Sequence, residues 1–96
     1  MLYAASKAGV INLSKSMALS TDNKVLCICP NWIDSDSTRE MDKTYLESEL
    51  KRIGQDRLIT MDEFNQSVYK IIMEYHSGDV IRIDIKGDKL WIAKVS

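Results

Sequence analysis

Tyr3 and Lys7 are the two residues whose types and spacing most clearly indicate chemistry. They stand four apart in a segment without proline, so a helix would place both side chains on one face. A free phenol ionises near ~10, and a neighbouring ammonium group stabilises the phenolate. Such a pair can transfer a proton to or from an alcohol or carbonyl oxygen. Taken alone, the spacing favours an ordinary pair on a helix surface.

The composition is that of a folded chain without a charge excess. Ninety-six residues allow one domain, and 45% hydrophobic with 28% charged residues argue against intrinsic disorder. A net charge of −1 provides no basic surface to neutralise a phosphate backbone, so nucleic-acid binding is not predicted. The apolar runs are far shorter than the ~20 residues of a membrane span, and no signal peptide is recognisable. We therefore expect a cytoplasmic protein that is not embedded in a membrane.

Neither the cysteines nor the acidic residues form a recognisable metal site. Cys27 and Cys29 are two apart, which is not the C-x-x-C spacing, and a strand would turn both to one face as small buried hydrophobic residues. Asp34-Ser35-Asp36 opens like a calcium-binding loop, but Arg39 and Tyr45 stand where Gly and Glu are needed. We therefore predict no bound metal.

The segment that carries Tyr3 and Lys7 is predicted to be helical from residue 3 to about residue 20. It lacks proline, and Ala, Leu, Met and Lys dominate it. Its apolar residues lie on two sides, which is typical of a helix that is buried on two sides. The apolar run 24–29, which Pro30 ends, fits a strand covered on both faces, as in a parallel sheet.

Further elements are predicted after this strand. Residues 30–38 have the composition of a polar loop, and residues 39–51 that of a loose, charged helix. Thr60 begins the clearest helix, because Thr60 and Glu63 can form a capping box. A strand over residues 80–85 follows, and residues 90–92 are compatible with another. The apolar residues at helical spacing after Thr60, predicted to face the core, are Phe64, Val68, Ile71, Ile72 and Tyr75.

The order strand, helix, strand predicts a parallel pair of strands joined by a right-handed crossover. Two parallel strands make a poor sheet alone, and a strand covered on both faces needs more strands and helices around it. The pattern therefore predicts an α/β fold in which this chain forms part of a larger sheet.

Four motifs resemble, in order, those of the short-chain dehydrogenase/reductase family. Tyr3-Ala4-Ala5-Ser6-Lys7-Ala8-Gly9 is similar to the family's Y-x-A-S-K helix, and Pro30-Asn31-Trp32-Ile33-Asp34-Ser35 resembles its P-G-x-I-x-T loop. The segment 57–63 resembles the Arg-containing lead into its last main helix, and residues 77–84 resemble its last strand. The resemblance covers nearly the whole chain. It implies that residues 1–96 are the C-terminal fragment of one domain with a Rossmann-like, doubly wound parallel sheet.

The resemblance also implies roles at the reacting centre. Tyr3 would be the general acid/base that protonates the carbonyl oxygen as hydride arrives at the carbon. Tyr3 and Lys7 would both also contact the cofactor. Lys7 would lower the pKa of Tyr3 and hydrogen-bond the nicotinamide ribose. Pro30 and Asn31 would shape the wall beside the nicotinamide ring. The implied cofactor is NAD or NADP.

Three more residues of the loop carry implied roles. The backbone at Ile33 would meet the nicotinamide carboxamide, and the Ser35 hydroxyl would stand where the family usually has Thr. Trp32 lines a substrate pocket in one interpretation and anchors the loop on the domain in the other. The sequence departs from the family at Asn31, which replaces a Gly, and at Ile85-Lys86, where two glycines are common.

We therefore interpret the chain as part of an oxidoreductase that interconverts an alcohol and a ketone, with a small-molecule alcohol or carbonyl substrate. The family's Gly-rich dinucleotide fingerprint and its catalytic Ser belong upstream, and no G-x-x-x-G-x-G occurs here. Two alternatives stay open, a catalytically inactive truncation and a non-catalytic interaction module. The small, two-sided apolar surface of helix 3–20 agrees with the homo-oligomer interface that the resemblance implies.

Overall fold

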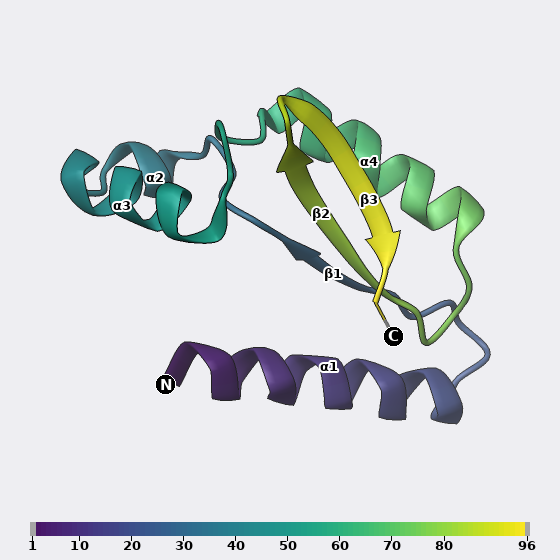
Figure 1. The fold of residues 1–96 in the computed structure, drawn as a ribbon. Helices are drawn as coiled ribbons and strands as arrows, with labels where there is room; N and C mark the ends of the chain where they lie inside the picture. The colour runs from purple at the N-terminus through teal and green to yellow at the C-terminus, as the bar shows by residue number, and fades with distance from the viewer. Residues whose placement is uncertain (1, 96) are drawn as a thin grey trace.

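The computed structural model describes residues 2–95, without the side chains of residues 2–6. Helices α1 and α4 lie on opposite sides of a small sheet, and α2 and α3 lie together beyond the end of β1 (Figure 1). The chain thus folds as layers of helix, sheet and helix, with a helical pair at one end. The elements in order are α1 (Leu2–Ser20), β1 (Cys27–Pro30), α2 (Asp36–Arg39), α3 (Lys43–Ile53), α4 (Met61–Glu74), β2 (Val80–Lys86) and β3 (Lys89–Lys94).

The sheet has the order β1-β2-β3. Strands β1 and β2 are parallel, with Cys27 opposite Val80, which confirms the predicted crossover through α4. Strands β2 and β3 are antiparallel. They are joined by Gly87 and Asp88, whose φ angles of 57° and 62° are those of a two-residue hairpin turn. The arrangement is a partial α/β fold of Rossmann-like type, as predicted.

The departure from the family at Ile85-Lys86 is accommodated within β2. Ile85 is fully buried, and Lys86 is opposite Lys89 at the base of the hairpin. A side chain at each position therefore continues the alternation of buried and exposed residues, and the sharp turn falls on Gly87 and Asp88 instead.

The core lies between α4 and the sheet, and one predicted core residue is wrong. Ile71 is fully buried against β2, but Ile72 is 50% exposed. Phe64 and Tyr75 are partly buried against the core, and the residue between them in the buried stripe is Ser67. The Ser67 hydroxyl donates to the Glu63 carbonyl at 2.7 Å, so a polar residue is buried at low cost. Because Ser67 is polar, the pattern of apolar residues alone does not show that the buried face of α4 runs through this position.

Strand β1 is shorter and less covered than predicted. It begins at Cys27 and includes Pro30, and of residues 25–29 Cys27 alone is buried. Val25 precedes the strand and is held by Gly78, whose amide donates to the Val25 carbonyl at 2.8 Å. In the part of the chain that the structure describes, β1 is an edge of the sheet, so one of its two edges lacks a neighbouring strand.

Candidate active site

The loop of residues 30–35 leaves the carboxyl end of β1 and is fixed at its start by β2. The Asn31 amide donates to the Ile83 carbonyl at 2.9 Å, and the Asn31 side-chain amide donates to Asp84 Oδ1 at 2.6 Å. Among the described residues Asp88 is the non-glycine residue with positive φ, so Asn31 does not need the conformational freedom of the family's Gly. Ligand sites of open parallel sheets lie at this end of the strands.

The middle of the loop runs parallel to the segment before α4. The Ile59 amide donates to the Trp32 carbonyl at 3.0 Å, and the Asp34 amide donates to the Ile59 carbonyl at 2.8 Å. Ile33 therefore lies opposite Ile59 without bonding to it. Because successive groups of an extended chain point in alternating directions, the Ile33 N–H faces away from Ile59. The Ile33 N–H is therefore a hydrogen-bond donor that takes no part in the pairing with Ile59.

The end of the loop is fixed by Thr38, which sequence reasoning missed. Thr38 is 7% exposed, and its Oγ1 accepts from the Ser35 amide at 2.9 Å. The same hydroxyl lies 2.7 Å from the Ile33 carbonyl oxygen, to which it donates. The signal available in the sequence was the S-x-x-T spacing of Ser35 and Thr38 at the start of a helix.

A pocket of about 790 Å³ opens beside this loop. It brings together five residues predicted for the site, and Trp32 is among them, so this tryptophan lines a pocket while its backbone is anchored. Residues 39–51 were predicted as a loose, charged helix, and α3 in this part of the chain supplies four of the lining residues. The lining residues are Pro30, Asn31, Trp32, Ile33, Ser35, Ser37, Thr38, Tyr45, Glu49, Arg52 and Ile53.

Helix α3 presents a charged group to this pocket. The helix begins at the N-cap Asp42, whose side chain accepts from the Tyr45 amide at 3.2 Å, and it ends at Gly54 with a φ of 73°. Arg52 is hydrogen-bonded to Glu49, and this bond is the main cause that lowers the pKa of the Glu49 carboxyl. The Tyr45 hydroxyl donates to the same carboxylate at 3.3 Å. The rim of the pocket therefore carries a paired, ionised carboxylate.

Helix α1 brings Lys7 to the neighbourhood of β1. The N-terminal half of α1 runs past the carboxyl end of β1, at the same end of the molecule as α2 and α3 (Figure 1). Lys7 is half-buried, and its charge acts on Cys29. Burial is the main cause that raises the pKa of the Cys29 thiol, and Lys7 opposes the rise. Lys7 does not line the pocket. Tyr3 lies in the first turn of α1, and its side chain is outside the described residues.

The cysteines lie on the same side of the strand as predicted, but Cys27 is buried and Cys29 is only half-buried. Cys27 and Cys29 share a face of β1, with their sulfur atoms 3.9 Å apart, and both are free thiols. Across the described range 2–95, no group of His, Cys, Asp and Glu side chains is arranged to hold a metal ion. Within the same range, no helix has the length and apolar character needed to cross a membrane.

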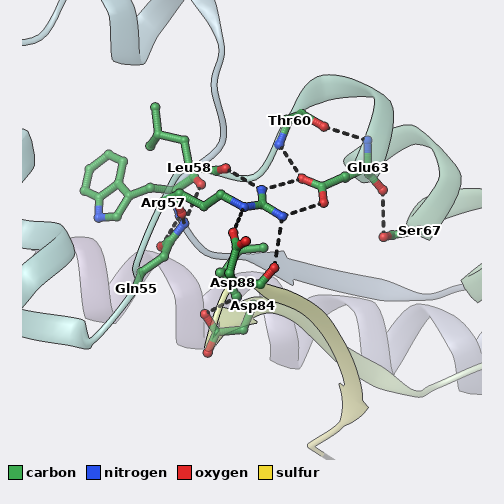
Figure 2. A network of polar contacts seen from close by, with 10 residues as sticks. Gln55, Arg57, Leu58, Thr60, Glu63, Ser67, Asp84 and Asp88 are labelled. Carbon is green, nitrogen blue, oxygen red and sulfur yellow. Dashed lines mark hydrogen bonds and ion pairs between the residues drawn. The ribbon is translucent and has the colours of Figure 1, made fainter.

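A network around Arg57 holds the segment that pairs with the loop (Figure 2). The Arg57 guanidinium donates two bonds to the Glu63 carboxylate, at 2.7 and 2.8 Å, and a further bond to Asp88 in the hairpin turn. Glu63 also accepts from the Thr60 amide at 3.0 Å, which completes the predicted capping box with Thr60 Oγ1. These bonds, that to Arg57 foremost, lower the pKa of Glu63 to about 2. The network thus ties Ile59 to both α4 and the hairpin.

Removing the Glu63 charge should destabilise the fold in a pH-dependent way. Because the folded-state pKa of Glu63 is depressed to about 2, its stabilisation is full above the unfolded value near ~4.5. It is lost as the pH falls from there towards 2. Glu63→Gln should therefore lower the free energy of unfolding by about 1–2 kcal/mol at pH 7, given that the side chain is 27% exposed.

Urea unfolding at a series of pH values measures this difference. The gap between the original chain and Glu63→Gln should close as the pH approaches 2. Glu47→Gln, at an exposed position of α3, is the matched control and should show no such gap. A Glu63→Gln gap of the same size at all pH values would contradict the assignment.

The comparisons with known proteins point to one enzyme type. The 3-oxoacyl-(acyl-carrier-protein) reductase MabA of Mycobacterium tuberculosis is 39% identical over 88 residues, which are 85% of this chain and 36% of MabA. The MabA of Mycobacterium bovis matches equally. The 3-oxoacyl-(acyl-carrier-protein) reductase FabG of Chlamydia trachomatis is 30% identical over the same share of each chain. The chain thus spans about a third of the length of the curated relatives it matches.

Two other comparisons gave no match, since neither a protein-family model nor a solved structure corresponds significantly to the chain. The curated relatives nevertheless agree with the four motifs and with the partial α/β fold. The chain therefore belongs to the short-chain dehydrogenase/reductase family and covers part of the length of such an enzyme.

Proposed function

We propose that the chain forms the nicotinamide side of the active site of an NAD(P)-dependent oxidoreductase that interconverts an alcohol and a ketone. The observation that carries the proposal is the Ile33 amide, which the pairing leaves directed away from Ile59 in a loop that lines a pocket. The names of the curated relatives support a 3-oxoacyl thioester as the carbonyl substrate.

The donor set of the loop fits the nicotinamide end of NAD or NADP. A carboxamide needs a donor for its oxygen and an acceptor for its nitrogen, and a backbone segment offers both kinds of group. The Ile33 amide would supply the donor, with Ser35 beside it and Pro30 and Asn31 as the wall along the ring. When bound, the reduced nicotinamide supplies hydride to the carbonyl carbon of the substrate.

Tyr3 and Lys7 would carry out the proton transfer to the carbonyl oxygen of the substrate. In the first turns of α1 they stand four residues apart, which places them on one face of the helix. The Tyr3 hydroxyl would donate its proton to the carbonyl oxygen, and the Lys7 ammonium would stabilise the phenolate that this leaves. In the reverse direction the Tyr3 phenolate would accept the proton of the alcohol.

We further propose that residues 1–96 correspond to the C-terminal portion of a single domain. The relatives are matched over 36% of their length, and the four motifs occur in the order that the family has near its C-terminus. The Gly-rich turn that holds the pyrophosphate and the Ser that polarises the carbonyl would come from the N-terminal half. Without that half the chain would be an inactive truncation. This is the alternative to the proposed oxidoreductase function.

Helix α1 would also pair with its equivalent in a second copy of the intact enzyme. Leu13 and Met17 are 61% and 48% exposed, and both are apolar residues on the outer side of this helix. Burying such residues against a second copy stabilises a dimer. Sedimentation of the intact enzyme should show a species larger than one chain, and a stable monomer would exclude this pairing.

Replacing Ile33 by Pro tests the observation that carries the proposal. Proline removes the N–H but tolerates an extended loop position, so the fold should survive. In an intact enzyme the KM for the cofactor should rise roughly tenfold, as expected for one lost hydrogen bond to a ligand. Ile33→Val, which keeps the amide, is the matched control. An unchanged KM for NADH and NADPH in Ile33→Pro would refute the assigned contact.

A further inference from the structure

The buried side chain of Gln55 is bonded to both backbone groups of Trp32. Gln55 is 4% exposed, and its Oε1 accepts from the Trp32 amide at 3.1 Å. Its Nε2 donates to the Trp32 carbonyl and to the Arg57 carbonyl, both at 2.8 Å. Figure 2 shows Gln55 next to Arg57 at the edge of the network that holds the start of α4.

This reciprocal pair fixes the orientation of the peptide groups around Trp32. A side-chain amide that bonds both the N–H and the C=O of one residue reproduces the paired bonds of a β-ladder. The Trp32 carbonyl also accepts from the Ile59 amide at 3.0 Å. With the polar groups of Trp32 turned to this side, the next N–H in the chain, that of Ile33, is turned to the other. Gln55 therefore sets the direction of the Ile33 donor.

Burial of a glutamine at this position is costly unless its amide is bonded. An apolar side chain would fill the same space, but it would leave the Trp32 N–H without its acceptor. The Trp32 carbonyl would also lose the bond that Gln55 donates. Gln55 uses three of its four hydrogen-bonding positions on loop backbone. It does not line the pocket, so any effect on a ligand acts through Trp32 and Ile33.

The position of Gln55 also links two walls of the pocket. It follows Gly54, at which α3 ends, and its own amide donates to the Leu50 carbonyl at 2.9 Å. A single residue thus joins the end of α3, which carries the rim of the pocket, to the loop that carries the Ile33 amide.

We propose that Gln55 is a positioning residue for the cofactor: its side-chain amide holds the backbone at Trp32 so that the Ile33 amide is directed to the nicotinamide. This inference rests on the proposed function for its ligand, and on the hydrogen bonds of Gln55 for its mechanism. Loss of the Gln55 amide should weaken cofactor binding and leave the proton transfer of Tyr3 and Lys7 unchanged.

The first arm of the test uses the 96-residue chain and amide hydrogen exchange. In Gln55→Leu, the protection of the Trp32 amide should fall by roughly tenfold or more, and the amides of α4 should keep theirs. Gln66→Leu, at an exposed position of α4, is the matched control. Gln55→Glu is a second variant that keeps the length and the acceptor but turns a carboxylate oxygen towards the Trp32 and Arg57 carbonyl oxygens. This repulsion should loosen the loop and lower the protection of Trp32 as well. Unchanged exchange at Trp32 in both variants would overturn the inference.

The second arm uses the intact enzyme and separates positioning from general stability. Gln55→Leu should raise the KM for NADH or NADPH by roughly tenfold, while kcat at saturating cofactor stays within about threefold and keeps its pH profile. A lower melting temperature with an unchanged KM would reduce Gln55 to a structural role and overturn the inference. If the unsubstituted enzyme has no nicotinamide-dependent turnover, the proposed function fails and the cofactor role of Gln55 fails with it. The exchange arm still reports the hydrogen bonds to Trp32 in that case.

Discussion

Replacing Tyr3 by Phe should lower the kcat of an intact enzyme that contains these residues by roughly 10²–10⁴, because the substitution removes the general acid/base. The aromatic ring stays, so the substitution changes the size of the side chain little. The KM for the cofactor should change far less than kcat, since the contacts proposed for Lys7, Ile33 and Ser35 stay in place. Steady-state oxidation of NADH or NADPH in the presence of a 3-oxoacyl thioester measures both constants.

A matched tyrosine serves as the control for this substitution. Tyr69 is 69% exposed on α4, away from the pocket, and Tyr69→Phe should leave kcat unchanged. A Tyr3→Phe enzyme with near-normal turnover would exclude Tyr3 as the acid/base, whatever the other residues do. An equal fall in both variants would indicate a defect in folding instead.

The isolated 96-residue chain should bind NADH and NADPH at least ~100-fold more weakly than the intact enzyme does. Hydrogen bonds to a charged pyrophosphate contribute about 1.5–3 kcal/mol each, and the Gly-rich turn that would provide them is not in this sequence. The contacts proposed for Lys7, Ile33 and Ser35 would have to offset the ordering of a long flexible dinucleotide by themselves.

Calorimetry or cofactor fluorescence on the isolated chain measures this affinity, with the intact enzyme as the reference. No saturation in the micromolar range is the expected result. Micromolar binding by the isolated chain would contradict the proposed division of the cofactor site between two halves of a domain. It would mean that the chain builds a complete dinucleotide site by itself.

The elements that depend on local sequence were predicted correctly. The capping box of Thr60 and Glu63 needs a spacing of three residues and nothing else, and the structure contains both of its bonds. The strand 80–85 alternates buried and exposed residues, and its period is visible in the sequence. The loop after β1 contributes five of the residues predicted for the site to the lining of one pocket, and their roles towards a cofactor stay predictions.

The parts that depend on distant contacts could not be read in the same way. The role of Gln55 exists only because Trp32 lies beside it in space, 23 positions earlier in the chain. Ser67 takes a place in the buried stripe of α4, and the predicted core face included the exposed Ile72 beside the buried Ile71. Strand β1 was predicted to lie inside a larger sheet, but among the described residues only β2 pairs with it. The pattern of a sequence predicts which surface of an element is apolar. It does not predict which other element packs against that surface, because this depends on the tertiary structure.

The most direct test of the account is nicotinamide-dependent reduction by an intact enzyme in which these 96 residues follow a dinucleotide-binding half. The measurement is the loss of the absorbance of reduced nicotinamide on addition of a 3-oxoacyl thioester, with NADH and NADPH each tried. The account predicts oxidation of one or both cofactors that requires the carbonyl substrate. A folded intact protein that binds the cofactor and oxidises neither form with any carbonyl substrate would contradict it.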